Sequence, residues 1–174
     1  MKTIFSAIVV LCTFVSGAQA LEWETLYEKG RWRLDLNLHD DGSLNCEART
    51  SNNSGAVFFI ESWDDGEMSV TFYNDNWDFG DEVVEEEFLI KIDRLSPWEI
   101  SGSKAESSLW VWLENSGQSH KFLQEVYNGN ALRLMNDNGV EIHRFSLSGS
   151  AATLIALAEC ADRIESKFDS SDPF

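Results

Sequence analysis

Apolar and polar residues alternate along most of the chain, which is the pattern of half-buried β-strands. Residues 32–38 carry an apolar side chain at every second position, and residues 44–48 repeat the pattern after Asp40-Asp41-Gly42. Glycine supplies the positive φ that a tight turn between two strands requires. This stretch therefore predicts a β-hairpin.

Three further hairpins follow from the same combination of alternating runs and turn residues. Their turns are Asp64-Asp65-Gly66, Asn115-Ser116-Gly117 and Asn136-Asp137-Asn138-Gly139. The strands expected around these turns are residues 57–63 with 68–73, 109–113 with 121–127, and 131–135 with 140–147. The segment between the second and third hairpins is less regular. There, residues 83–93 indicate a strand, and Pro97 within residues 95–102 indicates a bend.

The pattern changes after Ser148-Gly149-Ser150, where apolar residues recur at spacings of three and four. Such spacing is typical of an amphipathic helix with one buried stripe. The stripe consists of Ala151, Leu154, Leu157, Ala158, Ala161 and Ile164. We expect a mainly β (β+α) protein, either an antiparallel β-sandwich or an open barrel, with one C-terminal helix packed on the sheet.

The N-terminal twenty residues have the features of a cleavable signal peptide. Lys2 provides a positive charge, residues 4–15 are largely apolar, and Ala18-Gln19-Ala20 is a cleavage pattern of small residues. The apolar run is shorter than the roughly twenty residues of a membrane span. We expect a secreted or periplasmic protein cleaved after Ala20, with a single domain over residues 21–168 and a polar tail over 169–174.

Cleavage would remove Cys12 and leave Cys46 and Cys160. Two cysteines in an oxidising compartment usually form a disulfide bond, so we expect Cys46 to pair with Cys160. A link that closes a loop of this size is worth roughly 4–5 kcal/mol on the chain-entropy model. In this prediction Cys160 lies on the flank of the helical stripe.

The composition excludes two classes of protein. The chain has 11 Phe, 7 Trp and 3 Tyr, which are too many aromatic residues for a disordered acidic protein. Its net charge of −17, which becomes −18 after loss of Lys2, would repel a nucleic acid. The same charge keeps an exported protein soluble and favours a cationic partner, such as a basic protein.

Candidate catalytic residues are sparse. His39, His120 and His143 are scattered along the chain, and no Gly-x-Ser-x-Gly motif or zinc-binding pattern accompanies them. The acidic run Glu85-Glu86-Glu87 places neighbouring carboxylates on opposite strand faces, and a solvated face explains it better than a glycosidase pair. We therefore expect no enzyme activity and no cofactor.

Two speculative binding sites remain. Asn74, Asn76 and Asp78 alternate ahead of Gly80, as oxygen ligands do in some calcium loops. Because two aromatic residues interrupt the run, an acidic loop is the favoured interpretation.

The second candidate site is aromatic. Trp77, Trp63 and Trp98 are candidates for stacking on a ligand, whereas we expect Trp32 in the core. Trp110 and Trp112 share one strand face, and we expect at least one of them to be buried.

Near the C-terminus, residues 145–152, 154–157 and Ala158-Glu159-Cys160 give the order strand, glycine, alanine-rich helix and cysteine, and residues 131–135 and 140 onward precede them in a similar layout. This segment resembles the C-terminus of the invasion-associated locus B family of small secreted alphaproteobacterial proteins. The resemblance implies a non-enzymatic, β-rich periplasmic or surface protein that acts in the envelope or in contact with a host. It supplies no catalytic residues.

Two functions are therefore expected from the sequence. The first is binding of an envelope or host-surface protein, with a basic partner favoured by the acidic charge. The alternative is a glycan-binding module that uses exposed tryptophans, with or without calcium, or a site for another small ligand.

Overall fold

The computed structural model describes residues 23–114 and 116–169, with side chains up to residue 165. The expected signal peptide therefore lies outside the described residues. Ten strands and two helices are found in these ranges. The strands are β1 (Trp23–Lys29), β2 (Trp32–Leu38), β3 (Leu44–Ser51), β4 (Val57–Trp63), β5 (Met68–Tyr73), β6 (Val84–Ile92), β7 (Trp98–Ala105), β8 (Ser108–Leu113), β9 (Ala131–Asn136) and β10 (Glu141–Ser146). The helices are α1 (Gly117–Asn128) and α2 (Ser150–Asp169).

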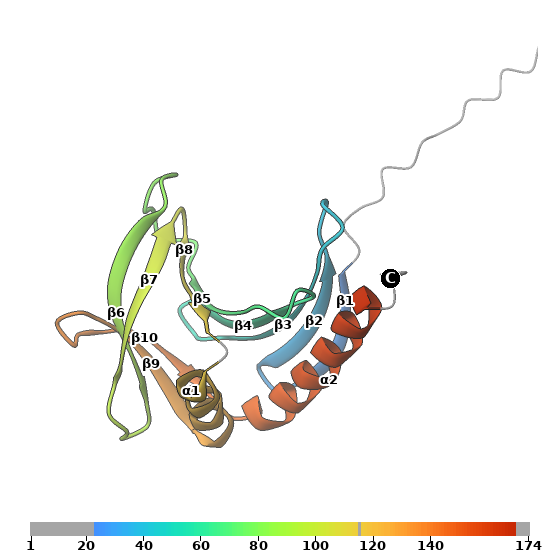
Figure 1. Ribbon diagram of the computed structural model, residues 1–174. Coiled ribbons are helices and arrows are strands. Elements are labelled where there is room, and N and C mark those ends of the chain that lie inside the picture. Colours follow the sequence, from blue (N-terminus) through green and yellow to red (C-terminus); the bar gives the residue numbers. More distant parts are fainter. Residues whose placement is uncertain (1–22, 115, 170–174) are drawn as a thin grey trace, which may run out of the picture.

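All ten strands form one antiparallel sheet with the order β1-β2-β3-β4-β5-β8-β7-β6-β9-β10. The sheet is strongly curved, and both helices lie on the outer side of the curve (Figure 1). The mainly antiparallel β fold with a C-terminal helix packed on the sheet is thus confirmed. Its single sheet corresponds to the open-barrel alternative and not to a sandwich of two sheets.

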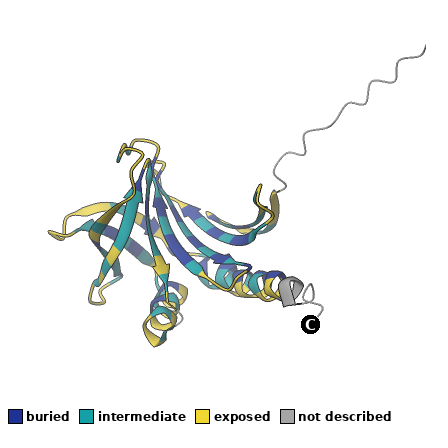
Figure 2. Ribbon diagram, turned by 45° about the horizontal axis from the view of Figure 1, so that its top comes forward, coloured by how far each residue is buried: buried dark blue, intermediate teal, exposed yellow. Residues whose placement is uncertain are grey.

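The core lies on one face of β2–β5, which packs against both helices and against the last strand of the same curled sheet. Buried residues recur within the strands, whereas the turns are exposed (Figure 2). Phe145 of β10 packs against Phe58 and Phe72, with ring centroids 5.8 and 5.9 Å away. Trp32 is fully buried, as expected, and its indole N–H donates to the Ser146 carbonyl at 3.1 Å. These contacts join the two ends of the strand order into one core.

Helix α2 is attached to the sheet by the expected disulfide bond, which joins Cys46 of β3 to Cys160. The helix contacts β1, β2, β3 and β4. Its buried residues, among those whose side chains are described, are Ser150, Thr153, Leu157, Cys160 and Ile164. Cys160 therefore lies within the buried stripe and not on its flank. Leu154, Ala158 and Ala161 of the predicted stripe line a groove between α2 and α1 instead.

Residues 121–127 form part of helix α1, so the strand expected there is a wrong prediction. The hydroxyl of Ser116 accepts a hydrogen bond from the Ser119 backbone N–H and caps the helix at its first turn. Phe122 and Val126, four residues apart, are buried against the core. Ser116 and Gly117, which suggested a hairpin turn, therefore mark the start of a helix.

Two strands were not predicted. In β1 most residues are exposed, and a register shift between Thr25 and Tyr27 interrupts its alternation. The bend expected over residues 95–102 is only partly correct, because the turn lies at residues 93–95, ahead of Pro97, and strand β7 begins at Trp98. No helix in the described parts of the chain is long and apolar enough to cross a membrane.

Candidate functional site

The sheet face opposite the helices carries three rows of paired side chains. Successive side chains of a strand point to opposite faces of the sheet. In β1–β5 and β8, the residues that alternate with the buried ones therefore point to this second face. The middle row runs through Thr25, Asp35, Glu47, Glu61, Ser69 and Trp112. The rows beside it run through Trp23, Asn37, Asn45 and Trp63, and through Arg33, Arg49, Phe59, Thr71 and Trp110. We call these residues the helix-free face.

Polar side chains on the helix-free face form a continuous hydrogen-bond network. Asn37 donates to Asn45 at 3.0 Å, and Asn45 donates to Glu61 Oε1 at 3.3 Å. The hydroxyls of Ser69 and Thr71 donate to Glu61 Oε2 at 2.8 and 2.9 Å. The network therefore fixes one carboxyl group in the centre of the face.

Asp35 is the centre of a second polar cluster on this face. Its side chain is 3% exposed and accepts from Thr25 at 2.8 Å. It also pairs with Arg33 at 2.7 Å and with Arg49 at 3.2 Å. Two arginines thus compensate for the burial of this carboxylate.

Glu47 lies between these two clusters and has an unusual pKa. Burial and the neighbouring charge of Glu61 raise its pKa from 4.5 to about 7, although Arg49 opposes the shift from 3.5 Å away. Desolvation disfavours the charged form of a carboxyl group. Glu47 therefore binds or releases its proton near neutral pH, which is uncommon outside functional sites.

Aromatic side chains flank the carboxyl groups at one end of the strands. His39 stacks on Trp63 with ring centroids 5.0 Å apart, and Trp112 lies 6.2 Å from Trp63. Trp112 is 51% exposed, and Trp110 is half-buried on the same face. The prediction that one of Trp110 and Trp112 belongs to the buried core is wrong, because both lie opposite the core.

Only one of the three candidate tryptophans, Trp63, lies on the helix-free face. Trp98 packs edge-on against Phe122 of α1, and its indole N–H donates to Glu125 at 2.7 Å. Trp77 is half-buried between β5 and β6 and packs against Phe79 and His143, with ring centroids 5.2 and 5.4 Å away. The structure therefore does not bring the three tryptophans together.

The residues of the candidate calcium loop bond mainly to the loop itself. Asn74 Oδ1 accepts from the Asn76 backbone N–H at 2.8 Å, and Asn74 Nδ2 lies 3.0 Å from His143 Nε2. Asp78 accepts from the Gly80 backbone N–H at 3.4 Å. Across the described residues, no three His, Cys, Asp or Glu side chains are grouped to hold a metal ion. Calcium binding stays a prediction.

Sequence reasoning missed the carboxyl row of Asp35, Glu47 and Glu61. The signal was present, because each residue occupies a polar position within an alternating strand. A hairpin turn fixes the register of its strands, so the turn at Asp41-Gly42 already implies that Asp35 and Glu47 pair. Acidic residues that are neighbours across strands lie far apart in the sequence, so runs of adjacent acids such as Glu85-Glu86-Glu87 do not reveal them.

Comparisons with family models, curated proteins and solved structures give no match to this chain. The resemblance to the invasion-associated locus B family therefore stays a prediction. Function has to be argued from the helix-free face itself.

Proposed function

We propose that this chain is a binding protein whose helix-free face binds a glycan. The observation that carries the proposal is the position of Trp112, which is half exposed beside Trp63 and in register with Ser69 and Glu61. An indole ring offers a flat apolar surface with an electron-rich face, and the C–H groups of a pyranose pack against such a surface. The adjacent carboxyl and hydroxyl groups suit the hydroxyls of the same sugar.

The polar groups of the face are ordered before any ligand arrives. Glu61 is held by Asn45, Ser69 and Thr71, and Asn45 is in turn held by Asn37. Binding therefore needs little further ordering of these side chains, which lowers the entropic cost of association. Asn45 and Ser69 are buried. A sugar hydroxyl would therefore meet the half-buried Glu61 and Thr71, whose polar groups already point in fixed directions.

The remaining parts of the proposal come from the sequence. A signal peptide would deliver the protein to the envelope or the exterior, where polysaccharides are abundant. We propose a non-enzymatic role for the face, in which it holds a glycan without cleaving it.

Isothermal titration with hexasaccharides of cellulose, xylan, chitin and mannan tests the proposal. We expect at least one hexasaccharide to bind, and Trp112→Ala to weaken that binding by about tenfold or more, as loss of an aromatic anchor does. The matched control is Tyr127→Ala, which removes a 40% exposed aromatic side chain on α1, on the other side of the sheet. Failure of all four sugars to bind, or unchanged affinity in Trp112→Ala, would contradict the proposal.

A further inference from the structure

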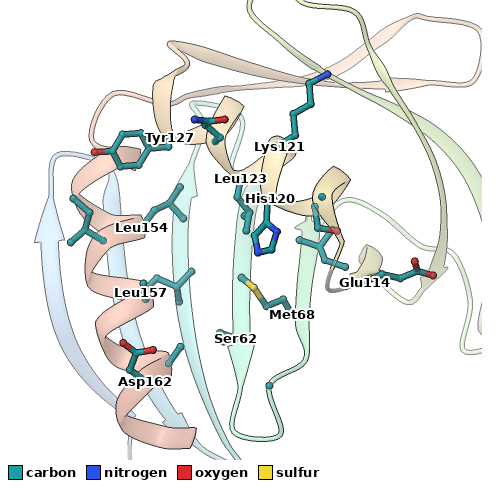
Figure 3. Close-up of a pocket in the computed structure, with 18 of the residues that line it drawn as sticks. Ser62, Met68, Glu114, His120, Lys121, Leu123, Tyr127, Leu154, Leu157 and Asp162 are labelled. Atoms are coloured by element: carbon teal, nitrogen blue, oxygen red, sulfur yellow. The ribbon is translucent and has the colours of Figure 1, made fainter.

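A large groove lies on the opposite side of the sheet, between α1 and α2. Its volume is about 1010 Å³, and strands β4, β5 and β8 form its floor. Leu154 and Leu157 of α2 and Leu123 and His120 of α1 point towards the space above Met68 (Figure 3). The two helices thus cover the flanks of this sheet face and leave its centre accessible.

The groove exposes apolar side chains that a folded chain normally buries. Ile155 of α2 is 51% exposed and Tyr127 of α1 is 40% exposed, and both line the groove. Contiguous exposed apolar surface bordered by polar residues marks interaction sites. A third element in the groove would complete the layer of helices on the sheet.

The rim of the groove is acidic. Glu114, Asp162 and Glu165 are exposed along it. Lys121 is the lysine of the rim, and it already pairs with Glu125 at 3.8 Å. A second copy of this chain, with its own charge of −17, and an anionic lipid would both be repelled.

We propose that this groove binds a basic amphipathic helix of a partner protein. Apolar residues at positions i, i+3, i+4 and i+7 of that helix would contact Met68, Leu154 and Ile155, and its lysines or arginines would face the acidic rim. The groove is separate from the helix-free face, so the two proposals stand or fall independently.

The test uses a fluorescent 18-residue peptide of leucine and lysine with leucines at that spacing, titrated with the mature protein in 0.15 M salt. A peptide of the same composition in scrambled order is the control. We expect the amphipathic peptide to bind about tenfold or more tightly than the scrambled peptide, because only the former presents an apolar face.

Variants separate the groove from the general acidity of the protein. Ile155→Asn removes an exposed apolar contact, and Ala158→Trp fills the groove from an exposed position of α2. We expect each to weaken binding by about fivefold or more. The double variant Asp162→Asn, Glu165→Gln removes two charges from the rim and should weaken peptide binding by about threefold or more. The matched control, Glu85→Gln with Glu87→Gln, removes the same charge from β6 and should change peptide binding by less than about twofold.

Three results would overturn the proposal. The first is equal affinity for the amphipathic and scrambled peptides, and the second is an equal loss from the two double charge variants. The third is unchanged binding in both Ile155→Asn and Ala158→Trp. Far-UV circular dichroism of each variant confirms that it is folded, and Ile155→Asn keeps the test valid if Ala158→Trp does not fold.

Discussion

Glu47 shows how one side chain makes the stability of this protein depend on pH. Its side chain is 18% exposed, and its pKa in the folded protein is about 7, against 4.5 for an unperturbed glutamate. Between these two values the folded state holds a proton that the unfolded state has released. Stability therefore decreases as the pH rises through this window, by at most about 3 kcal/mol from this group.

We predict that Glu47→Gln removes this dependence, because glutamine resembles the protonated carboxyl group. The variant should be more stable than the wild type at pH 8 and nearly equal to it at pH 5. Urea unfolding at both pH values measures the difference. Glu87→Gln, at an exposed position of β6, is the control and should have little effect at either pH. Equal effects of Glu47→Gln at pH 5 and pH 8 would contradict the account.

At the scale of single elements, helix α1 is where the sequence pattern was misread. Turn residues at 115–117 suggested a hairpin, but the same serine that favours turns also caps helices. Phe122 and Val126 have the four-residue spacing of a helix. In so short a segment, however, the apolar positions fit the two-residue period of a strand almost as well. Tertiary contacts favour the helix, because Phe122 packs on Trp98 of β7 and the Val126 carbonyl accepts from the Ser150 hydroxyl of α2.

The cap of α1 provides a direct prediction. Ser116→Ala removes the hydroxyl that accepts from the Ser119 backbone N–H, and we expect the free energy of unfolding to decrease by about 0.5–2 kcal/mol. Chemical denaturation measures this loss. Ser116→Asp should largely restore stability, since aspartate also caps helices. Equal stability of Ser116→Ala and the wild type would show that the helix start does not depend on the cap.

Helix α2 and the sheet are linked across a sequence separation of 114 residues by the disulfide bond. We predict that Cys46→Ala with Cys160→Ala lowers the free energy of unfolding by about 2–5 kcal/mol, because the unfolded chain gains freedom. Cys46 belongs to the face that packs on the helix, opposite the carboxyl row. Ligand binding to the helix-free face should therefore persist in the double variant at temperatures where it is folded. Loss of binding without loss of stability would contradict this separation of faces.

At the scale of the whole molecule, the sequence predicts local structure better than long-range order. Turn residues and alternation predicted the hairpins β2–β3, β4–β5 and β9–β10, because each is formed by one short continuous stretch of the chain, Trp32–Ser51, Val57–Tyr73 and Ala131–Ser146. The neighbours β5–β8 and β6–β9 join strands far apart in the chain, and no turn specifies them. Trp112 is placed beside Ser69 only by the pairing of β5 with β8. The predicted hairpins alone therefore could not show which residues share the helix-free face.

The two faces of the sheet also explain why the tryptophans have different roles. Trp32 and Trp98 contact the core or α1, whereas the opposite face with the carboxyl row carries Trp23, Trp63, Trp110 and Trp112. A sequence with seven tryptophans gives no means of separating these groups until the order of the strands is known. The central claim is that the second group forms the ligand site.

The most direct test of that claim is a titration of ¹⁵N-labelled mature protein with the hexasaccharides of cellulose, xylan, chitin and mannan, followed through the assigned indole N–H signals. The account predicts that at least one sugar shifts the signals of Trp63 and Trp112 while those of Trp32 and Trp98 stay in place. Shifts confined to Trp98 or Trp77, or no indole shift with any of the four sugars, would contradict it.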